Sequence, residues 1–402
     1  MNVFRKADIL IPKNADLEKW SVVACDQFTS EPEYWHKAEK IVGDAPSTLN
    51  LVYPEAYLSD GDERIESINK AMKEYIAGDI FKEYPSSIIY IERTLPGGEV
   101  RKGLIGAVDL EKYDYSKGSK SAVRATEGTV IERIPPRVKI RENASIELPH
   151  VILLINDESK NIIEKVSKEN KIYDFELMLG GGHLAGWLLS DKEADDVINK
   201  FNKFEENAPD GLLFAVGDGN HSLATAKTCW DNLKSSLTES ERETHPARYC
   251  LVEVENIHDD ALVFEPIHRV VFNVDPKQVI DELQNEYECS QSDNGGHKID
   301  FVYGFEKGTL YIKDSSSALA VGTLQQFLDR HGYETDYIHG SDVVEKLAKS
   351  DNTIGFILPV SDKSDLFKTV ISDGALPRKT FSMGEANEKR YYMEAKKIST
   401  DD

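Results

Sequence analysis

Cysteine, long apolar runs and signal-like segments are scarce or missing from this sequence, and each shortage excludes a class of protein. The four cysteines (Cys25, Cys229, Cys250 and Cys289) have no paired spacing. This argues against a disulfide framework or a cysteine zinc site and is typical of a reducing cytosol. No apolar run approaches the length that spans a bilayer, and the polar start does not resemble a secretory signal. We therefore expect a cytoplasmic protein with no membrane partner.

The common catalytic and nucleotide-binding motifs are also missing. The sequence contains no GxGxxG, GxxxxGKS/T or GxSxG pattern, which disfavours the usual dinucleotide, P-loop and serine-hydrolase sites. Its 10 histidines show no HExxH and no other tight ligand spacing, so we predict no dedicated metal site.

Positive charge is in short supply. The chain has 48 Lys and Arg against 71 Asp and Glu, for a net charge of -23. Such a chain repels a phosphate backbone at a distance, and we predict that nucleic acid is not a partner. The total does not exclude a local basic pocket, so a small phosphorylated ligand remains compatible with it.

The remaining composition is that of a globular protein large enough for two domains. Of its 402 residues, 40% are hydrophobic and 30% are charged, within the ordinary range. Helical periodicity over 60–77 and apolar strand-like runs at 151–155 and 212–216 alternate in an irregular order, which favours an α/β protein with a mixed sheet. We predict a main domain over 1–272 and a smaller α/β domain over 273–402 that contributes to the site.

A short loop between an apolar run and a helical pattern carries the richest chemistry: Gly217-Asp218-Gly219-Asn220-His221-Ser222. Glycines allow a sharp turn, and a helix N-terminus favours an anion. His221 and Ser222 can donate to phosphate oxygens, while Asp218 can orient His221 or the water shell of a magnesium ion. The alternative is that Asp218 or Asn220 merely caps the helix and Gly219 makes the turn.

Three further segments are candidates for the same chemistry. In residues 124–129, Glu127 can act as a base while Arg124 and Thr129 contact a phosphoryl group; a solvated loop is the alternative. His268 and Arg269 can bind phosphate or can be satisfied inside the core. The last segment offers a cation and a hydroxyl for a polyphosphate, or only surface ion pairs: Lys379 and Thr380.

Six stretches are distinctive when taken together: GLIGAVDLEKYD at 103–114, RATEGT at 124–129, GDGNH at 217–221, EPIHR at 265–269, DYIHG at 336–340 and LPRKTF at 376–381. With them the sequence resembles a bacterial family of unknown function, DUF1015. The resemblance implies a core like that of ParB-like and sulfiredoxin-like proteins, whose relatives bind nucleotides at a similar loop and in one branch phosphorylate free serine. The family loop usually reads DGHHR. This sequence has Asn220 in place of the first His and Ser222 in place of the Arg, and it has Thr126 where a His often precedes the glutamate. Arg124, Arg269 or Lys379 are candidates to replace the missing charge.

These observations favour a small-molecule phosphotransferase that uses ATP or ADP with magnesium on a hydroxyl metabolite, with free serine as the first guess. A non-catalytic nucleotide- or metabolite-binding regulatory protein and a phosphate-ester or nucleotide hydrolase are the alternatives. The predicted catalytic residues are Glu127, Asp218 and His221. The predicted phosphate- or nucleotide-binding residues are Gly217, Gly219, Asn220, Ser222, Arg124, Thr129, His268, Arg269, Lys379 and Thr380.

Overall fold

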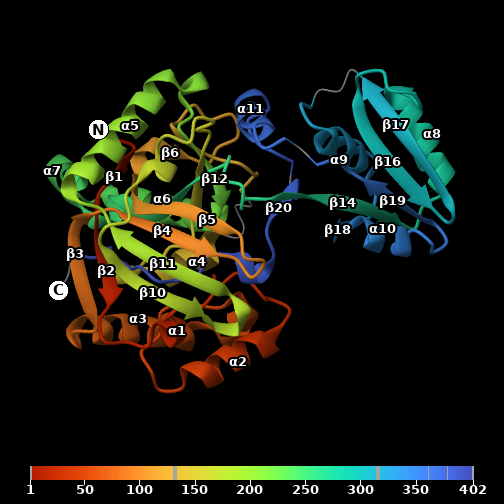
Figure 1. The fold of residues 1–402 in the computed structure, drawn as a ribbon. Helices are drawn as coiled ribbons and strands as arrows, with labels where there is room; N and C mark the ends of the chain where they lie inside the picture. The colour runs from red at the N-terminus through yellow and green to blue at the C-terminus, as the bar shows by residue number, and fades with distance from the viewer. Residues whose placement is uncertain (1, 130–133, 314–316, 361, 378, 401–402) are drawn as a thin grey trace. The chain divides into compact units, whose positions relative to one another are not determined.

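The chain forms two compact units in the computed structural model (Figure 1), which describes residues 2–129, 134–313, 317–360, 362–377 and 379–400. The first unit comprises Met1–Leu262 and Glu385–Asp402, and the second comprises Val263–Gly384. The second unit therefore begins earlier than the boundary predicted near 273, and the end of the chain returns to the first unit. The boundary differs because β14 (Phe264–Phe272) pairs with strands of the second unit.

The first unit is built on a mixed sheet in the order β10-β11-β4-β5-β13-β9-β12-β7-β6, with β1 paired to β5. This confirms the predicted α/β class with a mixed sheet, because β12 is parallel to β7 and antiparallel to β9. The bounds are β1 (Phe4–Arg5), β4 (Ile89–Thr94), β5 (Val100–Asp109), β6 (Tyr113–Asp114), β7 (Val123–Ala125), β9 (Ile152–Ile155), β10 (Lys171–Leu177), β11 (Gly182–Leu188), β12 (Phe214–Asp218) and β13 (Tyr249–Asn256).

Helices cover both faces of this sheet because its strands alternate between two apolar clusters. Ile89 and Ile91 belong to the cluster that contains residues of α1–α3, whereas Tyr90 belongs to the cluster that contains residues of α5 and α6. The helix predicted over 60–77 is confirmed as α3. The helices are α1 (Leu17–Trp20), α2 (Pro32–Val42), α3 (Asp62–Ala77), α4 (Ile134–Arg141), α5 (Asp191–Asn207), α6 (Asn220–Lys234) and α7 (Glu239–Thr244). None of the helices in the described ranges combines the length and apolar character needed to cross a bilayer.

Two short strand pairs complete the first unit. They join β2 (Ala7–Pro12) to β3 (Phe81–Ser87) and β8 (Ile146–Glu147) to β21 (Lys396–Lys397). The second of these pairs places the end of the chain beside a segment that lies far from it in sequence.

The second unit has its own sheet, in the order β15-β17-β16-β19-β14-β18, with β20 paired to β14. The EPIHR stretch lies in β14, between the strand that contains most of DYIHG and the strand that begins at the end of LPRKTF. The bounds are β15 (Glu288–Ser290), β16 (His297–Tyr303), β17 (Glu306–Lys313), β18 (Thr335–His339), β19 (Thr353–Ile357), β20 (Phe381–Met383), α8 (Pro276–Glu286), α9 (Ala320–His331), α10 (Ser341–Leu347) and α11 (Asp365–Ser372).

The segment that follows the second unit is mostly extended. After the short η9 (Ala386–Glu388), Tyr391 bridges to Val23 and Ala395 bridges to Leu10. Tyr392 through Ala395 are almost completely buried. We call residues 385–398 the returning strand. It is buried because the first unit supplies backbone partners along its length.

Buried arginines hold the returning strand in place. Arg390 donates to the carboxylates of Glu253 and Glu394 and, over 2.9 Å, to the carbonyl of Pro149. Arg93 donates to carbonyl oxygens of the same segment, and the Arg101 guanidinium does so over 3.3 Å. Removing one member of such a buried set leaves an uncompensated charge.

The pKa values of two acids of β13 are shifted in opposite directions beside these arginines. Burial alone would raise the pKa of Glu253, but Arg390 and Arg101 hold it below its usual value. Burial raises the pKa of Glu255 well above its usual value, although Arg101 opposes that rise. Arg101 Nε nevertheless lies 2.8 Å from Glu255 Oε1, so this carboxyl group also has a cationic partner.

We predict that Arg390→Met lowers the free energy of unfolding by about 3–5 kcal/mol, because Glu253 and Glu394 remain buried without their cation. Urea denaturation measures the change. Lys397→Met is the matched control, since Lys397 is exposed in the same segment and its loss should cost less than about 0.5 kcal/mol. Equal stability of the Arg390 variant and wild type would contradict this account of the returning strand.

Candidate functional site

Two of the predicted motifs meet where β7 and β12 end side by side. Ala125 pairs with Val216 in parallel register, so Thr126 lies against the loop at 217–222. The Thr126 N–H donates to Asn220 Oδ1 over 3.3 Å, Asn220 Nδ2 donates to Thr126 Oγ1 over 3.4 Å, and that hydroxyl donates to the carbonyl of Val216 over 2.6 Å. Thr126 and Asn220 are thus hydrogen-bond partners of each other.

The start of α6 is not capped by a side chain. Gly219 is the N-cap residue with φ of 79°, and a Cβ there would lie 3.0 Å from Val151 Cα. Asp218 Oδ1 accepts from the Gly219 N–H over 2.9 Å, while Asn220 is directed to Thr126. The simple capping interpretation therefore has no support at Asp218 or Asn220. The positive end of the helix dipole remains suited to an external anion.

A lysine from the returning strand supplies a cation to the loop. Lys389 Nζ lies 3.2 Å from Asp218 Oδ2, and the two side chains are only 16% and 24% exposed. Lys389 and Asp218 are 171 positions apart (389 − 218), so local spacing does not indicate that they meet. Its place depends on the burial of the neighbouring Arg390.

Asp26 and His150 also lie at the loop 217–222, although no sequence motif indicated them. Asp26 Oδ2 lies 3.8 Å from His150 Nε2, which is 3.1 Å from Ser222 Oγ. Burial would raise the pKa of Asp26, but His150, a hydrogen bond from Gln27 and the charge of Lys389 together hold it below its usual value. The site therefore holds an ionised carboxylate in addition to Asp218.

The predicted residues of 124–129 separate into two groups. The Arg124 guanidinium faces away from the loop: it donates to the Ser121 carbonyl and to Asp210 Oδ2, each over 2.8 Å. Its predicted phosphate contact is therefore not favoured by this arrangement. Glu127 directly follows Thr126 at the loop, and Thr129 Oγ1 is buried with no hydrogen-bond partner among the described atoms. His221 lies in the first turn of α6, where its carbonyl accepts from Thr225 over 2.8 Å.

The predicted residues of the second unit serve its own packing. The His268 ring is buried, and its Nδ1 accepts from the Leu358 N–H over 3.1 Å. Burial lowers the pKa of His268, and the charges of Arg269 and His339 add to that effect. A neutral, satisfied imidazole of this kind fits the structural alternative.

Arg269 is completely buried and joins the EPIHR and LPRKTF stretches. It donates to Gln325 Oε1 over 3.2 Å and to the Lys379 carbonyl over 2.9 Å, and its guanidinium lies 4.9 Å from the Tyr337 ring centre. Thr380 donates to the Pro377 carbonyl over 2.5 Å. The side chain of Lys379 is exposed, and Arg378 lies outside the described residues. Arg269 and Thr380 are therefore engaged in the core of their unit.

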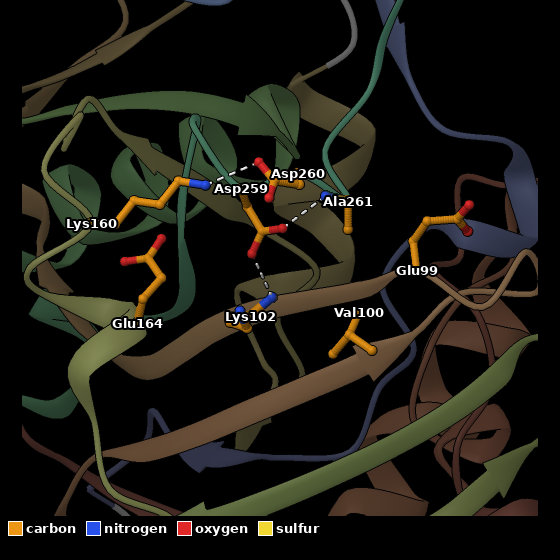
Figure 2. A pocket seen from close by; sticks show the side chains of 8 residues that line it. All are labelled: Glu99, Val100, Lys102, Lys160, Glu164, Asp259, Asp260 and Ala261. Atoms are coloured by element: carbon orange, nitrogen blue, oxygen red, sulfur yellow. Dashed lines mark hydrogen bonds and ion pairs between the residues drawn. The ribbon is translucent and has the colours of Figure 1, made fainter.

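A separate cavity of about 250 Å³ lies in the first unit and shares no residue with the loop (Figure 2). Lys160 Nζ pairs with Asp260 Oδ1 over 3.0 Å, and the Asp259 carboxylate accepts from the main-chain N–H groups of Lys102 and Ala261 over 3.2 and 2.9 Å. These bonds close the turn after β13. The lining consists of Glu99, Val100, Lys102, Lys160, Glu164, Asp259, Asp260 and Ala261. Across the described ranges, no three His, Cys, Asp or Glu side chains are grouped so as to hold a metal ion.

The comparison with curated proteins finds no match. Solved structures give distant matches: a free serine kinase mutant in complex with AMP is 12% identical, covers 75% of this chain and 93% of its own, and has a TM-score of 0.40. SbnI with a C-terminal truncation, from Staphylococcus aureus, is 12% identical over 70% of this chain and 83% of its own, with a TM-score of 0.37. A conserved hypothetical protein from Pyrococcus furiosus is 11% identical over 73% and 92%, with a TM-score of 0.34. Scores this low carry no argument about activity.

A family match gives the firmer relationship. It spans residues 8–331, most of the chain, and includes the loop at 217–222. The chain belongs to the family described as "Protein of unknown function (DUF1015)".

Proposed function

We propose that this protein is a small-molecule phosphotransferase that binds ATP or ADP at the loop 217–222 and acts on a hydroxyl metabolite. The observation that carries the proposal is the start of α6, which has no side-chain cap and has the Lys389 ammonium beside it. A helix N-terminus and a nearby cation together are suited to phosphate oxygens. Free serine is the first acceptor to test.

Phosphoryl transfer needs positioning and charge compensation more than covalent chemistry by the protein. In this proposal the first turn of α6 and Lys389 bind the phosphates, and His221 and Ser222 donate to them. Lys389 takes the part that the sequence had suggested for Arg124, Arg269 or Lys379. Glu127 accepts the proton of the acceptor hydroxyl, since it follows Thr126 directly at the loop.

Magnesium would arrive with the nucleotide. Mg²⁺ usually keeps several waters and takes one or two carboxylates together with substrate phosphates. The carboxylates of Asp218 and Asp26 fit that requirement, because both are partly buried beside Lys389 and the pKa of Asp26 is held below its usual value. The ion would offset phosphate charge, while Asp218 and Asp26 would orient its water shell.

A hydrolase is the second candidate, because Ser222 Oγ lies 3.1 Å from His150 Nε2. A serine within hydrogen-bond reach of a histidine is the arrangement of an activated nucleophile. Release of phosphate without an acceptor would favour this alternative. Saturable nucleotide binding with no product would instead favour a regulatory binding protein.

We predict that ATP and ADP bind the wild type with magnesium in calorimetric titration, and that Lys389→Met weakens the binding about 10- to 100-fold. A charge-assisted contact contributes about 1.5–3 kcal/mol, which corresponds to that range. His221→Ala should also weaken binding, and Lys397→Met, an exposed lysine of the same segment, should not. A folded wild type that binds neither nucleotide would contradict the proposal.

We predict that Glu127→Gln keeps nucleotide affinity and lowers turnover about 100- to 10,000-fold, as expected for loss of a general base. A coupled assay with a panel of hydroxyl metabolites, starting with serine, measures turnover. Calorimetry on the same preparation separates binding from chemistry. Unchanged turnover would assign the base role to another carboxylate and contradict this placement of Glu127.

A further inference from the structure

Behind Ser222 lies a buried chain of hydrogen bonds that decides which way its hydroxyl can donate. His150 Nε2 is 3.1 Å from Ser222 Oγ, and His150 Nδ1 is 2.8 Å from the Tyr392 hydroxyl. The oxygen of the Tyr392 hydroxyl accepts a hydrogen bond from the Cys25 N–H over 3.1 Å. His150 is 7% exposed and Tyr392 is 1% exposed, so water does not compete for these bonds as it would at the surface.

We propose that Tyr392 and His150 are positioning residues that fix Ser222 as a hydrogen-bond donor to an anion, and that Ser222 is therefore not a nucleophile. The inference rests on the proposed anion site at α6 and specifies how that site recognises its ligand. The inference follows from the direction in which each hydrogen bond between Tyr392, His150 and Ser222 must donate.

The direction begins at Tyr392. Its oxygen already accepts from the Cys25 N–H, and burial raises the pKa of the phenol well above its usual value. The hydroxyl therefore keeps its proton and has it to donate. The Cys25 thiol is the other nearby acceptor, but a thiol sulfur accepts weakly whereas an imidazole nitrogen accepts well. The proton accordingly goes to His150 Nδ1.

A neutral imidazole that accepts at Nδ1 must carry its proton at Nε2. The ionised Asp26 carboxylate, 3.8 Å from Nε2, favours a proton at the same nitrogen. If His150 becomes doubly protonated, Nε2 still carries a proton. In each of these states Nε2 donates to Ser222 Oγ and cannot accept its proton.

Ser222 then has its own hydrogen to give to another acceptor. A phosphoryl oxygen at the start of α6 is such an acceptor, and it would receive Ser222 together with the Lys389 ammonium. A serine whose partner nitrogen is already protonated gains no general base, which is what a nucleophilic serine needs. The serine–histidine pair thus favours anion binding over covalent hydrolysis.

The tautomer of His150 can be measured without any ligand. In the full chain labelled with ¹⁵N-histidine, long-range ¹H–¹⁵N spectra distinguish a proton on Nε2 from one on Nδ1, and His150→Gln identifies the signal. We expect a protonated Nε2 throughout the range in which the protein is folded. An Nδ1–H tautomer with a bare Nε2 would overturn the inference, whatever the nucleotide titrations show.

Tyr392→Phe removes the donor that fixes the ring. We expect the His150 signals to show a mixture of tautomers and ATP affinity to fall about five-fold, the size of one ordinary hydrogen bond. Tyr391→Phe is the matched control, because Tyr391 is also buried but its hydroxyl donates to the Met178 carbonyl. An unchanged His150 tautomer in the Tyr392 variant would show that Tyr392 is not the residue that fixes it, and would contradict its positioning role.

A fluorophosphonate probe, which forms a covalent adduct with activated serines, gives an independent measurement. We expect no adduct at Ser222 by mass spectrometry of the wild type. An adduct there would overturn the assignment and favour the hydrolase. Absence of nucleotide binding together with an Nε2–H tautomer would instead refute the proposed function while leaving the donor chain intact.

Discussion

The buried contacts of Arg390 are the interaction on which the rest of the site depends. Arg390 joins Glu253 of the central β13 to Glu394 and so keeps the returning strand inside the first unit. That strand carries Lys389 to the loop and Tyr392 to His150. Because desolvated charges are costly unless paired, this network tolerates few alternative positions of the segment. The need to pair the buried charge of Arg390 thus fixes the positions of Lys389 and Tyr392 at the site.

The side chains of the loop have partners that lie far from them in the sequence. Asn220 and Thr126 bond to each other, so each satisfies polar groups of the other. Ser222 lies beside His150, and Lys389 supplies a positive charge at the loop. A cation and a hydroxyl group are therefore both present near the start of α6.

The direction of the hydrogen bonds matters as much as their lengths. Ser222 and His150 lie at a distance that suits either an activated nucleophile or a positioned donor. The proton of the Tyr392 hydroxyl distinguishes these two roles of Ser222, because Tyr392 bonds to His150 and His150 bonds to Ser222. The Tyr392 hydroxyl accepts from a main-chain N–H and keeps its own proton, so it donates to His150. The hydrogen bond from His150 to Ser222 then has a fixed direction.

Local pattern in the sequence determined the α/β class, the helix α3 and the place of the loop between a strand and a helix, because each depends on neighbouring residues. It also brought the stretches 124–129 and 217–222 into one hypothesis. Only the tertiary structure decided that Arg124 and Arg269 are engaged elsewhere and that Asp26, His150 and Lys389 are at the loop. These side chains are separated by tens to hundreds of residues. Their meeting depends on strand register and on the buried path of the returning strand, which local spacing does not encode.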